Sequence, residues 1–121
     1  MDLPDPEKLS LHANKARQVQ VTQKPPRPRK GERFIRGPIP LKWIAKAAQQ
    51  PGRALHVALA LWFLAGVEKT RTFALSNSIL KLMKVDRFAK SRGLEVLETA
   101  GLVEVNRHDG RNPVVTILDV D

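Results

Sequence analysis

Cysteine is absent from the 121-residue sequence, which excludes disulfides, cysteine-based zinc sites and thiol catalysis. The N-terminal residues lack the basic stretch followed by an apolar run that marks a secretory signal. The longest apolar run, from Val57 to Val67, is too short to span a bilayer. These absences predict a soluble, cytoplasmic protein with no membrane partner.

Recognisable catalytic arrangements are also missing from the sequence. It contains no phosphate-binding glycine loop, no HExxH motif and no serine, histidine and acid set that a sequence can nominate. Its three histidines, His12, His56 and His108, fall in unlike predicted elements. We therefore expect neither an enzyme nor a bound metal, cofactor or small-molecule ligand.

Positive charge is what the sequence has in excess. The net charge is +9, which suits a polyanionic partner. Between residues 15 and 36, eight basic side chains accompany a single acid, Glu32. From residue 41 onward, 12 basic residues stand against 8 acidic ones. The excess is therefore greatest in the N-terminal part, which is either a solvated linker or an arm that contacts nucleic acid.

Apolar residues divide the chain into two parts. Residues 1–33 have few of them and include QKPPRPRKGER, a mixture of proline and positive charge typical of a disordered arm. Residues 34–121 hold most of the hydrophobic residues and are predicted to form one small domain. A core of that size is marginal alone, so a homodimer is one arrangement that would enlarge it.

Two helices are expected early in the domain. The first covers residues 41–49, and the second covers residues 53–67. An i, i+3, i+4, i+7 spacing predicts the buried face of the first helix, and this face consists of Leu41, Ile44, Ala45 and Ala48. The second helix is apolar nearly all round, which is typical of a central core helix. A dimer interface on one of its sides remains an alternative.

A short strand within residues 70–75 and two further helices are expected next. Ser76 is a good N-cap for a helix over residues 77–83, because a hydroxyl can accept a hydrogen bond from an unpaired first-turn amide. Asp86 has the same role for a helix over residues 87–100.

A β-hairpin is predicted to close the domain. Gly101 stands where a helix ends in the left-handed conformation. Strands are expected over residues 102–107 and 114–120, and the basic turn HDGRN joins them. The predicted class is therefore mainly α with a small β-hairpin, an α+β domain.

The stretch LSNSILKLMKVDRFAKSRGLEVLETAGLVEVNRHDGRNPVVTI resembles the winged helix-turn-helix family of bacterial and archaeal transcription regulators. Three features carry the resemblance. The first is a pair of short helices separated at Val85 and Asp86, and the second is LEVLETAGLVEV, which passes from a helix into a strand. The third is GRNPVVTI, which follows the wing. It implies that helix 87–100 enters the major groove of duplex DNA and that a wing at residues 107–112 contacts the backbone or the minor groove.

The candidate DNA-binding residues follow from this arrangement. If Leu94 and Leu97 point into the core, Gly93 also lies on the buried face of helix 87–100. The basic residues of its first two turns then lie on the exposed face or at the border between the two faces. The predicted helix contacts are Arg87, Phe88, Lys90, Ser91 and Arg92. The predicted wing contacts are Arg107, His108, Arg111 and Asn112. The predicted phosphate contacts of the arm are Arg27, Arg29, Lys30 and Arg33.

The sequence thus favours a sequence-specific duplex-DNA-binding protein that regulates transcription at the nucleoid. Two alternatives remain open. A winged helix also serves as a protein-interaction or dimerisation module, and the arginine-rich arm is suited to RNA.

Overall fold

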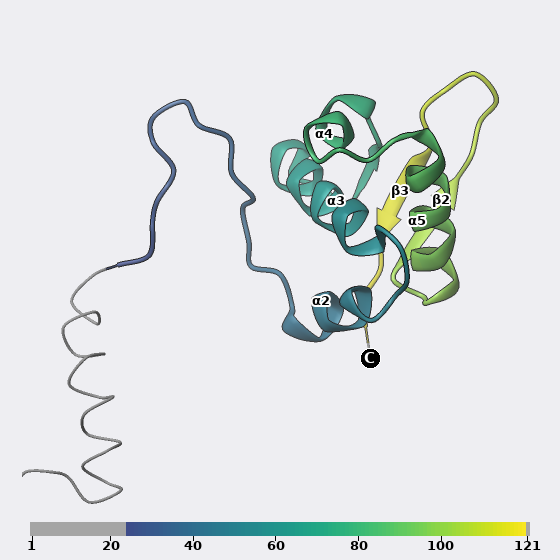
Figure 1. Ribbon diagram of the computed structural model, residues 1–121, viewed down its shortest axis with the longest axis horizontal. Helices are drawn as coiled ribbons and strands as arrows, with labels where there is room; N and C mark the ends of the chain where they lie inside the picture. Colours follow the sequence, from purple (N-terminus) through teal and green to yellow (C-terminus); the bar gives the residue numbers. More distant parts are fainter. Residues whose placement is uncertain (1–23, 121) are drawn as a thin grey trace, which may run out of the picture. The chain divides into compact units, whose positions relative to one another are not determined.

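The computed structural model describes residues 24–120 (Figure 1). The chain divides into two units between Arg33 and Phe34. In the first unit, residues 24–33 are exposed and form no helix or strand. Their one turn is closed by Glu32, whose carboxylate accepts a hydrogen bond from the Arg29 amide at 2.8 Å. The disorder predicted for the remainder of the arm concerns residues 1–23, which lie outside the described range.

The second unit is an α+β domain, as the sequence predicted. Its described elements, in chain order, are α2 (Leu41–Ala48), α3 (Ala54–Glu68), β1 (Thr72–Ala74), α4 (Asn77–Leu82), α5 (Arg87–Thr99), β2 (Val103–Asn106) and β3 (Val114–Ile117). The strands form one antiparallel sheet with the order β1-β3-β2. The predicted hairpin is therefore extended by β1, which pairs with the outer side of β3.

The sheet has one apolar and one polar face. Phe73 lies opposite Val115, and Val115 lies opposite Val105, so these side chains form a row across the three strands. On the other face, Thr72 lies opposite Thr116 and their hydroxyl oxygens are 3.0 Å apart. Because side chains alternate along a strand, the apolar row is turned toward the helices and completes the core.

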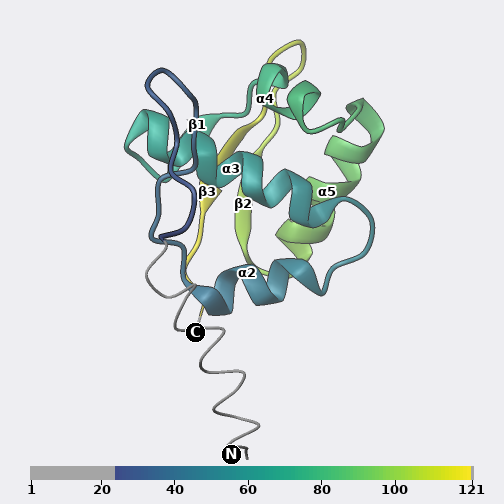
Figure 2. The same cartoon turned by 60° about the vertical axis from the view of Figure 1, so that its left-hand side comes forward.

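Helix α3 is the centre of the domain, and Figure 2 shows it crossing in front of the sheet between α2 and α5. It packs on α2, α4, α5 and β1. Its buried positions run along most of its length, and they are Ala54, Val57, Ala58, Ala60, Leu61 and Leu64. The predicted core helix is confirmed, and its apolar character all round reflects neighbours on several sides.

The predicted buried face of α2 is only partly right, because Ile44 is half-buried against the core but Leu41, Ala45 and Ala48 are exposed. Trp43 and Ala47 are the buried residues, whereas Leu41 is 80% exposed. The Trp43 indole N–H donates to the Leu118 carbonyl at 3.0 Å, and its ring meets Trp62 edge-on at 5.4 Å. At about 100° per residue, burying this large ring turns Leu41 and Ala45 to the far side of the helix.

A glycine allows α5 to approach α3 closely. A Cβ atom built on Gly93 would lie 2.8 Å from Val57 Cγ2 and 3.7 Å from the Ala54 Cα. Val57 is fully buried, and its branched side chain has one strongly preferred rotamer in a helix. Val57 therefore has little room to move, and its side chain packs directly against the backbone of α5 at Gly93.

We predict that Gly93→Ala destabilises the domain. Alanine favours a helix interior over glycine by roughly 0.5–1 kcal/mol, but overpacking a tight core costs about 1–3 kcal/mol. The free energy of unfolding in urea should therefore fall by about 1 kcal/mol. Ser91→Ala, at an exposed position of α5, is the matched control and should be neutral or raise stability by a few tenths of a kcal/mol, roughly. A stabilised Gly93→Ala protein would show that the helices can separate.

Candidate nucleic-acid interface

A tight turn links α4 to α5. Lys84 has a left-handed backbone with φ of 60°, and its amide donates to the Lys81 carbonyl at 3.1 Å. The next amide, of Val85, donates to the Leu80 carbonyl at 2.9 Å. This pair of bonds is a Schellman motif, which ends a helix and is accompanied by an apolar contact. Val85 supplies that contact, because it is buried in the core.

Asp86 begins α5, as predicted. Its carboxylate accepts a hydrogen bond from the Ala89 amide at 2.8 Å, which satisfies one of the unpaired donors of the first turn. Ser76 occupies the corresponding position before α4, but the predicted hydroxyl cap is wrong. Its oxygen instead lies 3.2 Å from the Ser78 hydroxyl. A nearby hydroxyl competes for the Ser76 side chain, and among the helices of residues 24–120 α5 alone has a side-chain N-cap.

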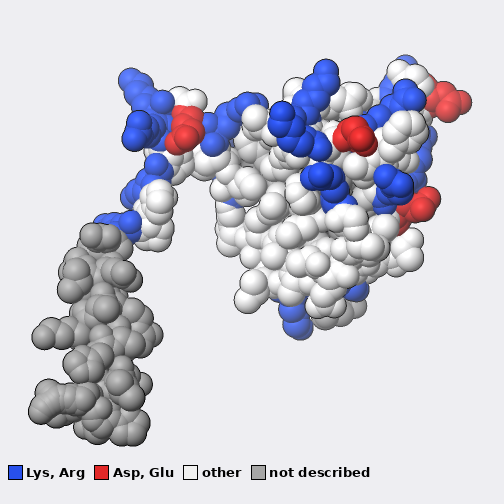
Figure 3. Space-filling view, in the orientation of Figure 1, with Lys and Arg blue, Asp and Glu red and all other residues white. Residues whose placement is uncertain are grey.

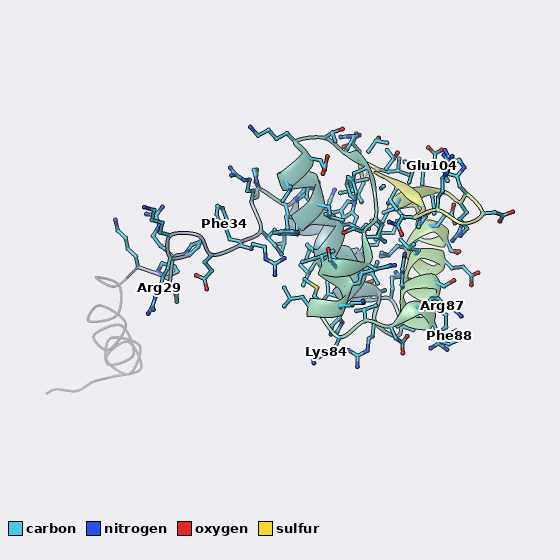
Figure 4. The ribbon with its side chains drawn as sticks, turned by 90° about the horizontal axis from the view of Figure 1, so that it is seen from above. Arg29, Phe34, Lys84, Arg87, Phe88 and Glu104 are labelled. Carbon is cyan, nitrogen blue, oxygen red and sulfur yellow. The ribbon has the colours of Figure 1, made fainter. Side chains whose placement is uncertain are left out.

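The rotation of α5 agrees with the sequence prediction. Gly93, Leu94 and Leu97 are buried, and the exposed residues of the first two turns are Arg87, Phe88, Ser91 and Arg92. Phe88 is 67% exposed, and the Arg87 guanidinium carbon lies 5.5 Å from its ring centroid. Figure 4 shows Arg87 and Phe88 together at one end of α5, well separated from Glu104.

Lys90 ties α5 to α4. Its ammonium donates to the Asn77 side-chain oxygen at 2.8 Å, and burial lowers the pKa of this ammonium below the ordinary lysine value. The sequence prediction placed Lys90 at the border of the core, which agrees with its half-buried position. It did not identify Asn77, because only the fold brings the first residue of α4 beside α5.

The loop between β2 and β3, residues 107–113, carries the predicted wing residues. His108, Arg111 and Asn112 are exposed, and the Arg111 amide donates to the His108 carbonyl at 3.2 Å within the turn. Arg107 differs from them, because its guanidinium forms an ion pair with Glu98 of α5 at 3.2 Å. Both partners are solvent-exposed, so the pair adds little stability, but it offsets the charge of Arg107.

A hollow of about 190 Å³ separates α5 from this loop. Basic side chains from both elements line it, with no acidic residue among them, and they are Arg87, Lys90, Arg107, His108 and Arg111. A larger hollow of about 810 Å³ adjoins α4 and also includes Arg87, Lys90 and Arg111. On the face of the domain seen in Figure 3, most of the lysine and arginine side chains gather in the upper half.

The predicted arm residues belong to the first unit. Arg27, Arg29, Lys30 and Arg33 are all exposed. Each retains a side chain accessible to a partner.

Neither a metal site nor a membrane span is found within residues 24–120. No group of three or more histidine, aspartate or glutamate side chains there is placed to hold a metal ion. None of the helices in this range is both long enough and apolar enough to cross a membrane.

We predict that the Asp86 cap contributes measurably to stability. Asp86→Ala should lower the free energy of unfolding by about 1 kcal/mol, because it leaves a first-turn amide without its acceptor. Ser76→Ala is the matched control, since it replaces the side chain at the N-cap position of α4 without breaking a capping bond. Equal losses for the two variants in urea denaturation would contradict the assignment of the cap to Asp86.

Comparison of this chain with known protein families, curated proteins and solved structures found no match. The interface is therefore defined by its own geometry: an exposed basic helix start, a basic loop beside it and a hollow between them.

Proposed function

We propose that this protein binds duplex DNA in a sequence-specific manner and regulates transcription. The observation that carries the proposal is the hollow between α5 and the β2–β3 loop, whose lining contains four lysine and arginine side chains, one histidine and no acid. A phosphate backbone is a ligand that such a lining attracts strongly. A cytoplasmic, nucleoid-bound location belongs to the same proposal.

The arrangement supports the interpretation of the fold as a winged helix-turn-helix. In this interpretation α4 is the first helix, α5 is the recognition helix and the β2–β3 loop is the wing. A recognition helix presents its N-terminal residues to base edges in the major groove. Those residues are the exposed ones of α5, and the Asp86 cap and the Gly93 contact fix their direction.

Individual side chains suit distinct parts of DNA. Arg87 and Arg92 can each form two hydrogen bonds with guanine or clamp a phosphate. Ser91 can bond to either, and the exposed Phe88 ring matches a thymine methyl group. Lys90 lines the hollow while its side-chain nitrogen is bonded to Asn77, so it stands where a phosphate would lie.

Acidic residues limit the contact to the beginning of α5. Glu95 is exposed further along the helix, and Glu98 is held by Arg107. Glu104 lies on β2, away from Arg87 (Figure 4). Phosphate would be repelled there, so the DNA contacts should be confined to the first two turns and the loop.

We predict that Arg87→Ala combined with Arg92→Ala abolishes selection of a DNA sequence. The wild-type chain should enrich a short motif from fragmented genomic DNA at about 0.15 M salt, where long-range surface attraction is screened. Each arginine that reads a base should contribute about 1–3 kcal/mol to binding that motif. The matched control is Lys42→Ala combined with Arg53→Ala, which removes the same charge from exposed positions of α2 and the start of α3.

The control separates site-specific contacts from general attraction. Equal losses in the two double variants would mean that charge alone drives binding. Retained selection in the Arg87 and Arg92 variant would refute the assigned interface, and failure of the wild-type chain to bind DNA would favour a protein-docking role.

We further predict that the arm neutralises phosphates. Replacing Arg27, Arg29, Lys30 and Arg33 with glutamine should weaken DNA binding and flatten its salt dependence. The slope of log K against log salt concentration should fall by roughly 0.9 for each phosphate that the arm no longer neutralises. An unchanged slope would show that the arm is not engaged, and stronger competition by RNA than by duplex DNA would assign the arm to RNA.

A further inference from the structure

A separate hollow of about 240 Å³ lies at the other end of the sheet. Strand β3 leaves the basic loop at Val114 and reaches this hollow at Ile117. The end of α3 forms one wall, and the segment from Arg36 to Pro38 forms another. None of the five basic residues of the candidate DNA interface lines it, so it is a distinct feature of the domain.

One donor beside this hollow has no acceptor. Trp62 lines the hollow, and its indole Nε1 is the one buried side-chain polar atom in the described part of the chain without a hydrogen-bond partner. The neighbouring indole of Trp43 is bonded to the Leu118 carbonyl. Buried donors are nearly always paired, so an unpaired one marks a place where an acceptor is favoured.

The charge of the lining is also one-sided. Arg36 and Arg71 contribute to it, and no acidic residue does. Arg71 bonds to Asp119 outside the lining at 3.2 Å, between two well-exposed side chains. Such exposed pairs are weak, so the Arg71 guanidinium can exchange this partner for another carboxylate. The rest of the lining is largely apolar, with Pro38, Trp62 and Ile117 among its members.

We propose that this hollow binds a small organic acid, in which a single carboxylate is attached to a flat apolar body. The carboxylate would accept hydrogen bonds from the Trp62 indole and from Arg71, with Arg36 adding positive charge beside it, and the apolar body would lie against Pro38 and Ile117. Drug-sized ligands occupy pockets of about 300 Å³ or more, so the volume restricts the ligand to roughly a single ring. This site does not depend on the proposed DNA-binding function.

Binding of the carboxylate to the Trp62 indole requires a local movement of the protein. The Trp62 Nε1 atom is covered in the structure, while residues 36–38 of the wall are exposed. Gly66 brings this segment close to α3, because a Cβ there would lie 3.1 Å from the Arg36 Cβ. Access of a carboxylate to the indole therefore requires a local shift, which we assign to this exposed segment.

The experiment is a titration of the full chain with benzoate, followed through the indole N–H signals in a ¹H–¹⁵N spectrum. The chain has two tryptophans, so there are two such signals, and Trp43 is an internal reference. We expect benzoate to shift the Trp62 signal saturably and in the direction of a stronger hydrogen bond. Benzamide, the uncharged analogue, should bind at least about tenfold more weakly, as expected for loss of a charged hydrogen bond.

Variants assign the site by calorimetry. Trp62→Phe and Arg71→Gln should each weaken benzoate binding about tenfold, whereas Arg53→Gln, an exposed arginine outside the hollow, should not change it. If Trp62→Phe fails to fold, Arg36→Gln takes its place. The proposal is overturned if the Trp62 signal does not respond to benzoate, if benzamide binds equally well, or if Arg71→Gln binds like the wild type. DNA binding is not measured here, so these outcomes are independent of it.

Discussion

The close approach of α5 to α3 at Gly93 is the constraint on which the arrangement of the domain depends. Helix α3 is held by neighbours on several sides, so its position is fixed by the core. Gly93 lets the backbone of α5 pack directly on the Val57 side chain of α3, and Leu94 and Leu97 of α5 are buried beside it. This contact between α5 and α3 determines the direction in which every exposed residue of α5 points.

Much of the fold was predictable because its signals are local. Hydrophobic spacing located the first helix, an apolar run located the second, and Asp86 and Gly101 marked the beginning and end of α5. The face of α2 was not predictable from spacing, because two different faces contain apolar residues. Trp43 decided between them through its bond to the Leu118 carbonyl, a residue 75 positions away in the chain. The left-handed Lys84 was equally hidden, since lysine carries no preference for that conformation.

The candidate interface also has features that the sequence predicted and features that it could not predict. The exposed residues of α5 could be named from helix geometry. The pairing of Lys90 with Asn77 and of Arg107 with Glu98 could not, because each joins elements whose separation only the folded domain sets. These pairs change the chemistry of the predicted residues: two of the basic groups are already engaged, whereas Arg87, Arg92 and Arg111 have no side-chain bond in the described structure except the contact of Arg87 with Phe88.

Helix α5 is bracketed by two examples of the same backbone motif. Lys84 and Val85 form one before it, and Gly101 and Leu102 form the other after it, where the Leu102 amide donates to the Leu97 carbonyl at 3.0 Å. Val85 and Leu102 are both buried, so the helix is anchored to the core at each end. A single residue inserted between them would rotate the following turns by about 100°, and neither anchor can slide to absorb it. The length of this segment is therefore more strictly determined than its outward side chains, which can be exchanged without moving either anchor.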